Sequence, residues 1–480
     1  MKSIIAAAAA LMLTGGVFAQ DTFEIEPAQA ATADVLVNQA LDSDLAWSVV
    51  ESLTTEVGPR LAGSEAEARA RAWGEALGNS LNFDRVAVEN FTMPFWDRGE
   101  LEISMTAPYN LALHGAALGG SGRSPRLGAI NSDVVYFRNV AALMAVADGS
   151  LEGKIAFVDG DPLVATQTGA GYGPANQRRR IGWQHAERAG ADAIVVRSVG
   201  SDHHRNPHTG MISSRDGEWA RIPVIAISNP DADQLRRLHE NGTPLAMHIR
   251  STAGWHGEVT SGNVVMDIVG SELPDEIVLI GGHLDSWDIG TGAIDDGAGI
   301  AISVAAAELI ARLPERPRRT IRVVMFGAEE VGLLGARAYA EQHADELPNH
   351  VLATESDFGA GRIWQFVSNV DAAANPAIDA IGRVMAPLGI LRGGNEDGES
   401  GPDIIPMAMN GVPTVGLSQD GMDYFNLHHT PDDTLDKIDP DALAQNVAAY
   451  VALVYLAANM DVDFRTPAEA SDVEENAAEQ

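Results

Sequence analysis

The 480-residue chain contains no cysteine. This absence excludes disulfide bonds, thiol catalysis, cysteine-ligated zinc sites and a lipidated N-terminal cysteine. His, Asp and Glu are therefore the strong metal ligands that the chain can offer. Lysine is scarce as well, since it occurs only at positions 2, 154 and 437, so arginine supplies nearly all of the positive charge.

Positive charge is scarce overall. The chain has 32 Lys and Arg residues against 67 Asp and Glu residues, which gives a formal net charge of −35 at pH 7. Nucleic-acid binding depends on Lys and Arg side chains that neutralise phosphates, so we expect no nucleic-acid partner. The acidic residues are spread along the chain, which indicates a solvated surface; adaptation to a salty environment is the second possibility. The apolar fraction of 45% excludes disorder as the main state.

Both ends of the chain have special compositions. Lys2, an apolar run over residues 4–13 and the small residues before Gln20 form the three-part pattern of a secretory signal peptide, residues 1–19. The run is shorter than the roughly 20 residues that span a bilayer, which favours a signal peptide over a membrane anchor. No later segment is expected to span a membrane, so we expect a soluble protein that is secreted or periplasmic. Residues 465–480 are acidic and predict a disordered tail.

The length predicts two or three domains. Residues 20–119 are assigned to the N-terminal helices and strands of a catalytic domain. Helical apolar spacing over residues 34–81, with a break at Gly and Pro in 56–64, predicts two helices around a loop. Short alternating runs over residues 86–111 predict strands.

An inserted module is expected over residues 120–258. Gly and Ser are frequent over residues 115–126, which predicts a boundary there. The module has several short apolar runs and few ligand-type residues apart from those around His208, so it predicts a small β-rich unit. Strands are expected at 134–137, 154–158, 193–196 and 222–227, and helices at 178–190 and 231–241.

Residues 259–464 repeat a pattern of strand, loop and helix. Near-continuous apolar strands that alternate with helices predict an α/β sheet with parallel strands and helices on both faces. Ligands of such sheets bind outside the carboxyl ends of the strands. Strands are expected at 276–280, 320–326 and 350–354, and helices at 297–312, 331–343 and 441–459.

Ligand-type residues accumulate where these strands end. One such residue alone is typical of a helix cap or a solvated turn, but here four separate loops contribute to one sheet edge. So many carboxylates would repel one another unless a multivalent cation lay among them. The residues are His283 and Asp285, Asp295 and Asp296, Glu329 and Glu330, Glu355 and Asp357, and His428 and His429.

The ligand types indicate the metal. Imidazole together with carboxylate suits Zn²⁺, with Mn²⁺ or Co²⁺ as substitutes, whereas oxygen ligands alone would favour Ca²⁺ or Mg²⁺. The candidates exceed what one tetrahedral zinc needs, and two metals about 3.5–4 Å apart with a bridging carboxylate use them better. Asp285 is placed to orient His283, and Glu329, beside Glu330, to take a proton from a metal-bound water. This combination predicts a hydrolase.

These residues resemble the co-catalytic di-zinc exopeptidases and, within that family, the carboxypeptidase Q branch. The most specific match is GHLDSWD at 282–288; others are GPRLAGS at 58–64, WDRGE at 96–100 and PHTG at 207–210. The resemblance covers nearly all of the chain between signal peptide and tail. It implies the zinc exopeptidase fold: α/β, with a mostly parallel mixed sheet, helices on both faces and an inserted β-rich protease-associated domain.

The resemblance also implies roles for single residues. His429 is preferred to His428 because it directly precedes Thr430, as the family's ligand precedes its Thr or Ser, and Asp357 is preferred to Glu355 for the same positional reason. The peptide bond between Asp295 and Asp296 is expected to be cis. The implied roles are His283 and Asp357 on one zinc, Glu330 and His429 on the other, Asp295 bridging both, Glu329 as general base and Asp285 as support of His283.

The implied activity is hydrolysis of dipeptides or short peptides by a metal-bridged hydroxide. Whether the enzyme is a carboxypeptidase, a dipeptidase or an aminopeptidase stays open, as does a di-metal hydrolase of N-acyl amides or cyclised glutaminyl peptides. His208 and Tyr424 are candidate pocket residues, the former from the inserted domain or a neighbouring subunit. A homodimer stays open, without a disulfide link. Two further alternatives for the whole chain are a catalytically dead binding protein and a calcium-stabilised scaffold. The alternative for the inserted module is a domain that only binds other proteins.

Overall fold

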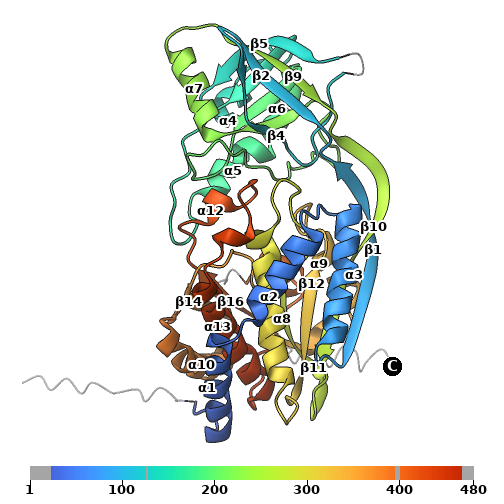
Figure 1. Ribbon diagram of the computed structural model, residues 1–480, viewed down its shortest axis with the longest axis vertical. Helices are drawn as coiled ribbons and strands as arrows, with labels where there is room; N and C mark the ends of the chain where they lie inside the picture. Colours follow the sequence, from blue (N-terminus) through green and yellow to red (C-terminus); the bar gives the residue numbers. More distant parts are fainter. Residues whose placement is uncertain (1–22, 126–127, 395–399, 467–480) are drawn as a thin grey trace, which may run out of the picture.

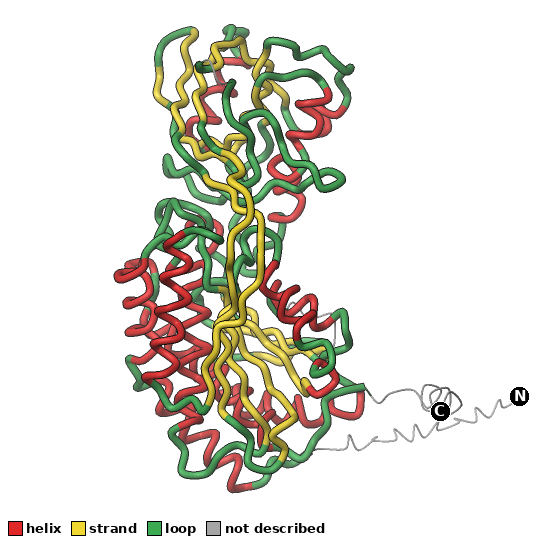
Figure 2. Tube along the Cα trace, turned by 90° about the vertical axis from the view of Figure 1, so that its right-hand side faces the viewer, coloured by secondary structure: helices red, strands yellow, loops and turns green. Residues whose placement is uncertain are grey.

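The computed structural model describes residues 23–125, 128–394 and 400–466. The predicted signal peptide and all but two residues of the predicted tail lie outside these ranges. Two lobes lie one above the other, each around its own mixed sheet (Figure 1). The long antiparallel strands β1 (Arg85–Asp97) and β10 (Gly254–Ile268) run from the lower lobe to the upper one (Figure 2).

The lower lobe contains the mixed sheet that the sequence predicts. Its four central strands are parallel, β14 runs antiparallel to β16, and β10 runs antiparallel to β12. The strand order is β1, β10, β12 (Arg319–Phe326), β11 (Leu273–His283), β13 (His350–Glu355), β16 (Thr414–Gln419), β14 (Ile363–Asn369) and β15 (Leu391–Arg392).

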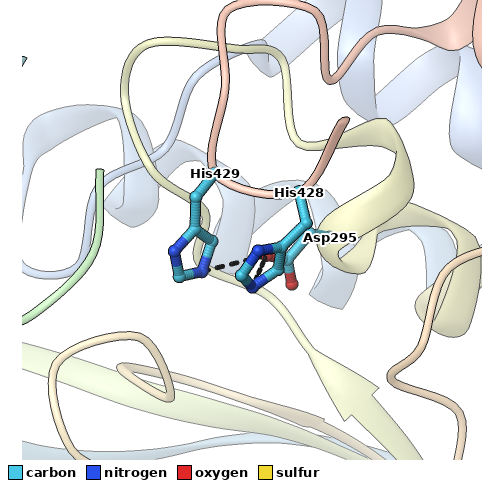
Figure 3. Close-up of side chains that lie close together, drawn as sticks. All are labelled: Asp295, His428 and His429. Atoms are coloured by element: carbon cyan, nitrogen blue, oxygen red, sulfur yellow. Dashed lines mark ion pairs between the residues drawn. The ribbon is translucent and has the colours of Figure 1, made fainter. Parts of the chain in front are cut away.

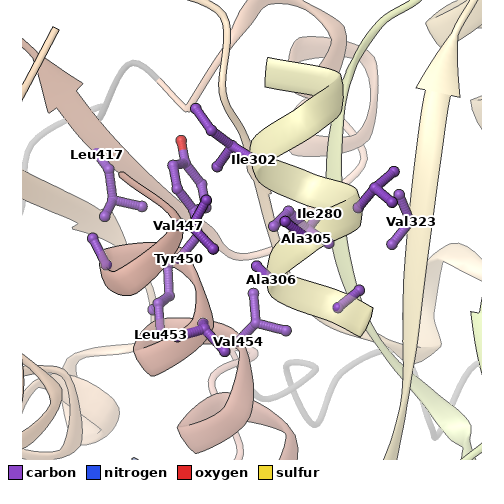
Figure 4. Close-up of a cluster of buried hydrophobic side chains, with 14 of the residues drawn as sticks. Ile280, Ile302, Ala305, Ala306, Val323, Leu417, Val447, Tyr450, Leu453 and Val454 are labelled. Carbon is purple, nitrogen blue, oxygen red and sulfur yellow. The ribbon is translucent and has the colours of Figure 1, made fainter. Parts of the chain in front are cut away.

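Helices cover both faces of this sheet, as expected. Side chains alternate along a strand, so Val278 and Ile280 of β11 pack on one core cluster and Ile277 and Leu279 on the other. The first cluster contains α8 (Ala298–Ala311) and α13 (Pro440–Asn459), whose side chains interdigitate (Figure 4). The second contains α9 (Leu334–Gln342) and α11 (Ile405–Ala408).

Helix α13 corrects one expectation. By length and composition it is apolar enough to cross a membrane, although no segment after the signal peptide was expected to be. In the structure it packs against α1 and α8, and 89% of its apolar window is buried. A helix that is hydrophobic on all sides is typical of a protein core. No other helix in the described ranges passes the same test.

The N-terminal segment forms three helices where two were expected: α1 (Pro27–Leu41), α2 (Leu45–Ser52) and α3 (Glu65–Ser80). The extra break lies over residues 42–44, where short polar side chains favour helix ends over helix interiors. The predicted break before α3 is confirmed. Ser64 caps α3 by accepting a hydrogen bond from the Glu67 N–H at 3.2 Å.

The upper lobe begins earlier than the predicted boundary at residue 120. The strands over 101–117 belong to the sheet of the upper lobe. Gly115 lets β4 pair closely with β8, because a Cβ at this position would lie 3.2 Å from the Ala226 carbonyl oxygen. The glycines therefore serve close packing and mark no linker. The strand order is β3 (Leu111–Ala112), β2 (Leu101–Ala107), β9 (Ala246–Ser251), β5 (Ile130–Phe137), β6 (Lys154–Val158), β7 (Ala193–Arg197), β8 (Val224–Ile227) and β4 (Gly115–Ala117).

Helices cover the upper sheet on both faces too. On one face Ile194 and Val196 pack with α4 and α6, and on the other Ala193 and Val195 pack with α7. Helix α5 lies at the lower end of this lobe, next to α12 of the lower lobe (Figure 1). These helices are α4 (Val140–Met144), α5 (Tyr172–Arg180), α6 (Gly182–Arg188), α7 (Asn229–Glu240) and α12 (Tyr424–Leu427).

Candidate metal centre

The predicted ligands meet at the carboxyl ends of the parallel strands. His283 is the last residue of β11, Glu330 follows β12, and Asp357 follows β13. Asp295 lies in the turn that leads into α8, and His429 follows α12. The peptide bond between Asp295 and Asp296 is cis, which confirms that expectation.

Asp295 lies between two groups of side chains. Its Oδ1 is 3.0 Å from His283 Nε2, which is 3.5 Å from Asp357 Oδ1. Its Oδ2 is 3.2 Å from His429 Nε2, which is 2.9 Å from Glu330 Oε2. One carboxylate thus faces two His-plus-acid pairs with separate oxygens, the geometry that a bridging ligand of two metals requires.

His428 and His429 both point toward Asp295 (Figure 3). Their rings stack with centroids 3.5 Å apart, and His428 Nε2 lies 3.6 Å from Asp295 Oδ2. His429 also has an ion-pair contact with Glu330, whereas among the described residues His428 has an ion-pair contact with Asp295 and none with Glu330. The geometry therefore favours His429 as a ligand in the pair with Glu330.

The neighbouring acids have other partners. Glu355 Oε2 accepts a hydrogen bond from the Asp403 N–H at 2.9 Å. Asp296 accepts from the backbone N–H groups of His283 and Gly299, each at 3.0 Å, and so joins the end of β11 to the start of α8. Its role as a helix cap was not predicted, because it depends on the direction in which the chain turns into α8.

Burial dominates the electrostatics of the cluster. Desolvation and the neighbouring carboxylates raise the pKa of Glu329 and of Glu330 well above the usual range. Desolvation opposes ionisation of Asp295 as well, yet hydrogen bonds with His283 and His429 hold its pKa well below its usual value. The positive charge that the imidazoles can carry is too small to balance the negative charge of all the buried carboxylates. A multivalent cation would balance it.

Unsatisfied oxygens support the same conclusion. Glu330 Oε1 is buried and accepts no hydrogen bond from the described residues, and the buried Asp295 Oδ2 has histidine contacts alone, at 3.2 Å from His429 and 3.6 Å from His428. Buried carboxylate oxygens in that state are costly unless a cation compensates them. Three groups each hold their ligand atoms within 4.8 Å of one another: His283 with Asp295 and Glu330, His283 with Asp296 and Asp357, and Asp295 with His428 and His429. The residues present therefore fit metal ions.

Asp285 connects three residues of the site. Its carboxylate accepts hydrogen bonds from the N–H groups of Glu329, at 2.9 Å, and Glu330, at 3.3 Å. Its backbone carbonyl lies 2.9 Å from His283 Nδ1, closer than its own Oδ1 at 3.8 Å. The His283 ring is therefore held mainly by the carbonyl, while the side chain holds the Glu329 loop.

Arg60 fixes the loops around the ligands. It is fully buried, and its guanidinium donates to the carbonyls of Leu284, Thr291 and Gly292 at 2.5, 2.7 and 2.9 Å. Its place in the GPRLAGS motif is explained by these bonds, which span more than 220 positions of the chain. Such long-range contacts leave no signal in local periodicity.

The two predicted pocket residues have different surroundings. Tyr424 is buried in the lower lobe, with its ring centroid 4.9 Å from His428 and 4.4 Å from Phe358. His208 is buried in the upper lobe, with Nε2 3.5 Å from Asp202 Oδ1. Among the described residues, its imidazole forms no hydrogen bond with the cluster. The backbone of the next residue, Thr209, contacts His429.

Three of the sequence motifs meet beside Thr209. Arg98, from WDRGE, donates to Thr209 Oγ1 at 2.8 Å and to the Ala117 carbonyl. The same guanidinium pairs with Asp288 of GHLDSWD at 2.6 Å and lies over the rings of Trp96 and Trp287, 5.4 and 5.2 Å from their centroids. The upper lobe is thus joined to the loop that follows His283.

A narrow gap borders the cluster, and Trp287, Thr430 and Asp433 line it together with Asp295, Glu330 and His429. Desolvation raises the pKa of Asp433 to about 7, and its Oδ1 accepts from the Ile294 N–H at 2.6 Å. Asp433 therefore supports the turn that holds Asp295.

Comparison with known proteins gives consistent matches. The model of peptidase family M28 matches residues 263–454. Carboxypeptidase Q of Mus musculus is 33% identical over 411 residues, which cover 85% of this chain and 84% of the mouse protein. The crystal structure of a peptidase M28 precursor from Shewanella amazonensis SB2B matches with a TM-score of 0.88 at 46% identity, over 92% of this chain and 99% of that one. Aminopeptidase YwaD of Bacillus subtilis is 24% identical over 514 residues, 99% of this chain and all of that protein.

Proposed function

The chain belongs to peptidase family M28 and is a metallo-exopeptidase, and on that premise we propose that it uses two zinc ions to hydrolyse dipeptides or short peptides. The observation that carries the proposal is the position of Asp295, whose two oxygens face two separate His-plus-acid pairs. A single metal would leave one of these pairs without a cation.

The proposed ligand sets follow from the measured contacts. His283 and Asp357 would hold one zinc together with Asp295 Oδ1. Glu330 and His429 would hold the other together with Asp295 Oδ2. Zinc is proposed because the set combines imidazole with carboxylate; Mn²⁺ or Co²⁺ can replace it in such a set.

Glu329 is the proposed general base. When bound, the two metals would lower the pKa of a water and polarise the substrate carbonyl. Glu329 takes a proton from the attacking water and returns it to the nitrogen as the C–N bond breaks, so that a free carboxylate and a free amine leave. The hydrogen bond from its N–H to Asp285 fixes the backbone of this residue.

The relatives guide the choice of substrate. Similarity to carboxypeptidase Q favours removal of a C-terminal residue, including from dipeptides. Similarity to an aminopeptidase over the whole chain supports a second candidate, removal of an N-terminal residue. A di-metal hydrolase of N-acyl amides is the third candidate, since hydrolysis of such a substrate breaks the same type of amide bond at the same metals.

Export and domain roles complete the proposal. The pattern over residues 1–19 supports a secretory signal and a secreted or periplasmic protein. We propose that the upper lobe is the protease-associated domain that the sequence resemblance implies. Short peptides are the proposed partners; the acidic charge argues against nucleic acid.

Mass spectrometry of peptide mixtures tests this function. The zinc-loaded protein is incubated with one set of tripeptides and dipeptides in four forms: free, N-acetylated, C-amidated and blocked at both ends. We expect cleavage of free and N-acetylated peptides and none of the C-amidated ones. Cleavage of C-amidated but not N-acetylated peptides would identify an aminopeptidase, and turnover of simple N-acyl amides alone would contradict the peptidase proposal. The Glu329→Gln variant is the matched control.

A further inference from the structure

The upper lobe contacts a proposed metal ligand through its backbone. The Thr209 N–H donates to the His429 carbonyl at 2.9 Å, and the Thr209 carbonyl lies 3.2 Å from His429 Nδ1. Both residues are buried. Thr209 and His429 are 220 positions apart in the chain and lie in different lobes.

The carbonyl contact favours one tautomer of the imidazole. A carbonyl oxygen can only accept, so the 3.2 Å contact is a hydrogen bond when His429 Nδ1 carries the hydrogen; Arg179 Nη1 lies farther from the same nitrogen, at 3.5 Å. Nε2 then presents its lone pair to Glu330 and Asp295, which is the state that a metal ligand requires. Partners of this kind hold a ligand ring in orientation and raise its basicity.

Arg179 of α5 donates to the same carbonyl and lies beside the imidazole, with Nη1 3.5 Å from His429 Nδ1. Its Nη1 donates to Thr209 O at 2.7 Å and its Nη2 to the Tyr172 hydroxyl at 2.8 Å. The side chain is 5% exposed, and within the described ranges it forms no ion pair with a carboxylate. A buried guanidinium that serves one carbonyl and one hydroxyl is costly to desolvate, which indicates a specific role for it.

The surroundings of Arg179 are shaped for this contact. Gly210 follows Thr209, and a Cβ at that position would overlap Arg179 Nη1, so a side chain there would displace the guanidinium. The Tyr172 ring stacks on Phe425 of α12 with centroids 4.2 Å apart. Helix α5 is thereby fixed against the segment that carries His429.

We propose that Arg179 is a positioning residue for the metal site of Glu330 and His429, acting through the Thr209 carbonyl. The upper lobe then completes this site and is more than a module for binding other proteins. The inference rests on the proposed two-zinc function. It predicts that loss of the guanidinium weakens one zinc site and leaves the site of His283 and Asp357 intact.

Zinc-binding measurements on the full-length mature chain test this inference. The metal-free wild type, Arg179→Met, Arg179→Lys and Arg178→Met are titrated with zinc against a chromophoric chelator. Arg178 is a matched control, because it is equally buried on the same helix but donates to the carbonyls of Arg197 and Ser198. His429→Ala identifies which binding step belongs to the affected site.

We expect two zinc-binding steps in the wild type. In Arg179→Met the step that His429→Ala abolishes should weaken about 10–100-fold, with the other step unchanged. Arg179→Lys keeps one donor for the carbonyl and should show a smaller loss; it also serves as the test if Arg179→Met does not fold. Arg178→Met should keep both affinities, even if its unfolding midpoint falls. At saturating zinc, kcat of Arg179→Met should recover while KM stays near the wild-type value.

Three results would overturn the inference. Equal zinc affinities in wild type and Arg179→Met would contradict it alone, as would equal weakening of both steps or the same selective loss in Arg178→Met. A wild type that binds fewer than two zinc ions would contradict the proposed function itself and this inference with it. The two failures are therefore distinguishable in one set of titrations.

Discussion

The Asp285 carboxylate accepts the backbone N–H of Glu329 at 2.9 Å. Its second oxygen accepts the N–H of Glu330 at 3.3 Å. Asp285 follows β11 and the two glutamates follow β12, so one side chain fixes two neighbouring strand ends relative to each other. The proposed base and a proposed ligand are thereby held in place by a carboxylate that belongs to neither proposed ligand set.

Replacing Asp285 therefore affects the loop more than the imidazole. Asp285→Ala removes both acceptors and should lower kcat about 10–100-fold, as loss of outer-shell partners does at metal sites. Asp285→Asn keeps one acceptor oxygen and should lose less. Steady-state kinetics on a free dipeptide measures both. A wild-type kcat in Asp285→Ala would contradict the role assigned to this carboxylate.

Glu329→Gln tests the division between base and ligand. Glutamine has the same shape but cannot take a proton, so kcat should fall by about 10²–10⁴-fold. Zinc content, measured by inductively coupled plasma mass spectrometry, should stay at the wild-type value because Glu329 is outside both proposed ligand sets. Loss of zinc together with activity would place Glu329 among the ligands.

The adjacent histidines form a natural pair of variants. His429 Nε2 contacts both Glu330 and Asp295, whereas His428 Nε2 lies 3.6 Å from Asp295. His429→Ala should lose one of two zinc equivalents, and His428→Ala should keep both. Zinc stoichiometry after gel filtration measures this, and the reverse pattern would exchange the two assignments.

Arg60 is expected to contribute to stability. It donates to three buried carbonyls, and Arg60→Met leaves them without that donor. We expect a loss of about 2–4 kcal/mol in the free energy of unfolding, because a hydrogen bond from a charged group contributes about 1.5–3 kcal/mol. Urea denaturation measures the loss, and Arg337→Met, at an exposed arginine, is the control. Equal stability of the two variants would contradict this role.

The pH dependence of stability has a source outside the metal centre. A hydrogen bond to Glu89 at 2.9 Å, with a second contact to Glu346 at 2.8 Å, raises the pKa of His343. Since the folded protein binds this proton more tightly, the contribution is full below the unfolded pKa of about 6.5 and disappears as pH rises through the raised value. His343→Gln should therefore lose more stability at acidic than at alkaline pH in denaturant titrations. An equal loss at both would refute the linkage.

Local patterns predicted much of this structure. The strands that end at His283, Phe326 and Glu355 follow from their apolar runs, and the convergence of their loops follows from the geometry of parallel sheets. The cover on both faces was predicted as well, and these features depend on residues close together in the chain. The mixed character of the sheet was implied by the family resemblance.

Features that depend on distant contacts were missed or misplaced. The boundary predicted at residue 120 falls after strands β2, β3 and β4, which belong to the upper sheet; β2 pairs with β9 and β4 with β8, far along the chain. Arg60 and Arg179 act through carbonyls that are distant in the chain. Gly292 is 232 positions from Arg60, and Thr209 is 30 positions from Arg179. Periodicity and composition do not reveal such pairs, although the Gly and Pro residues of the motif that contains Arg60 predicted a break between two helices.

Zinc titration of turnover tests directly whether catalysis requires two metal ions per chain. Metal-free protein receives increasing equivalents of zinc, and hydrolysis of a free dipeptide is measured at each step. The two-zinc account predicts that activity rises until two equivalents per chain are bound and then stays constant. A constant rate after one equivalent, or full activity with calcium alone, would contradict it.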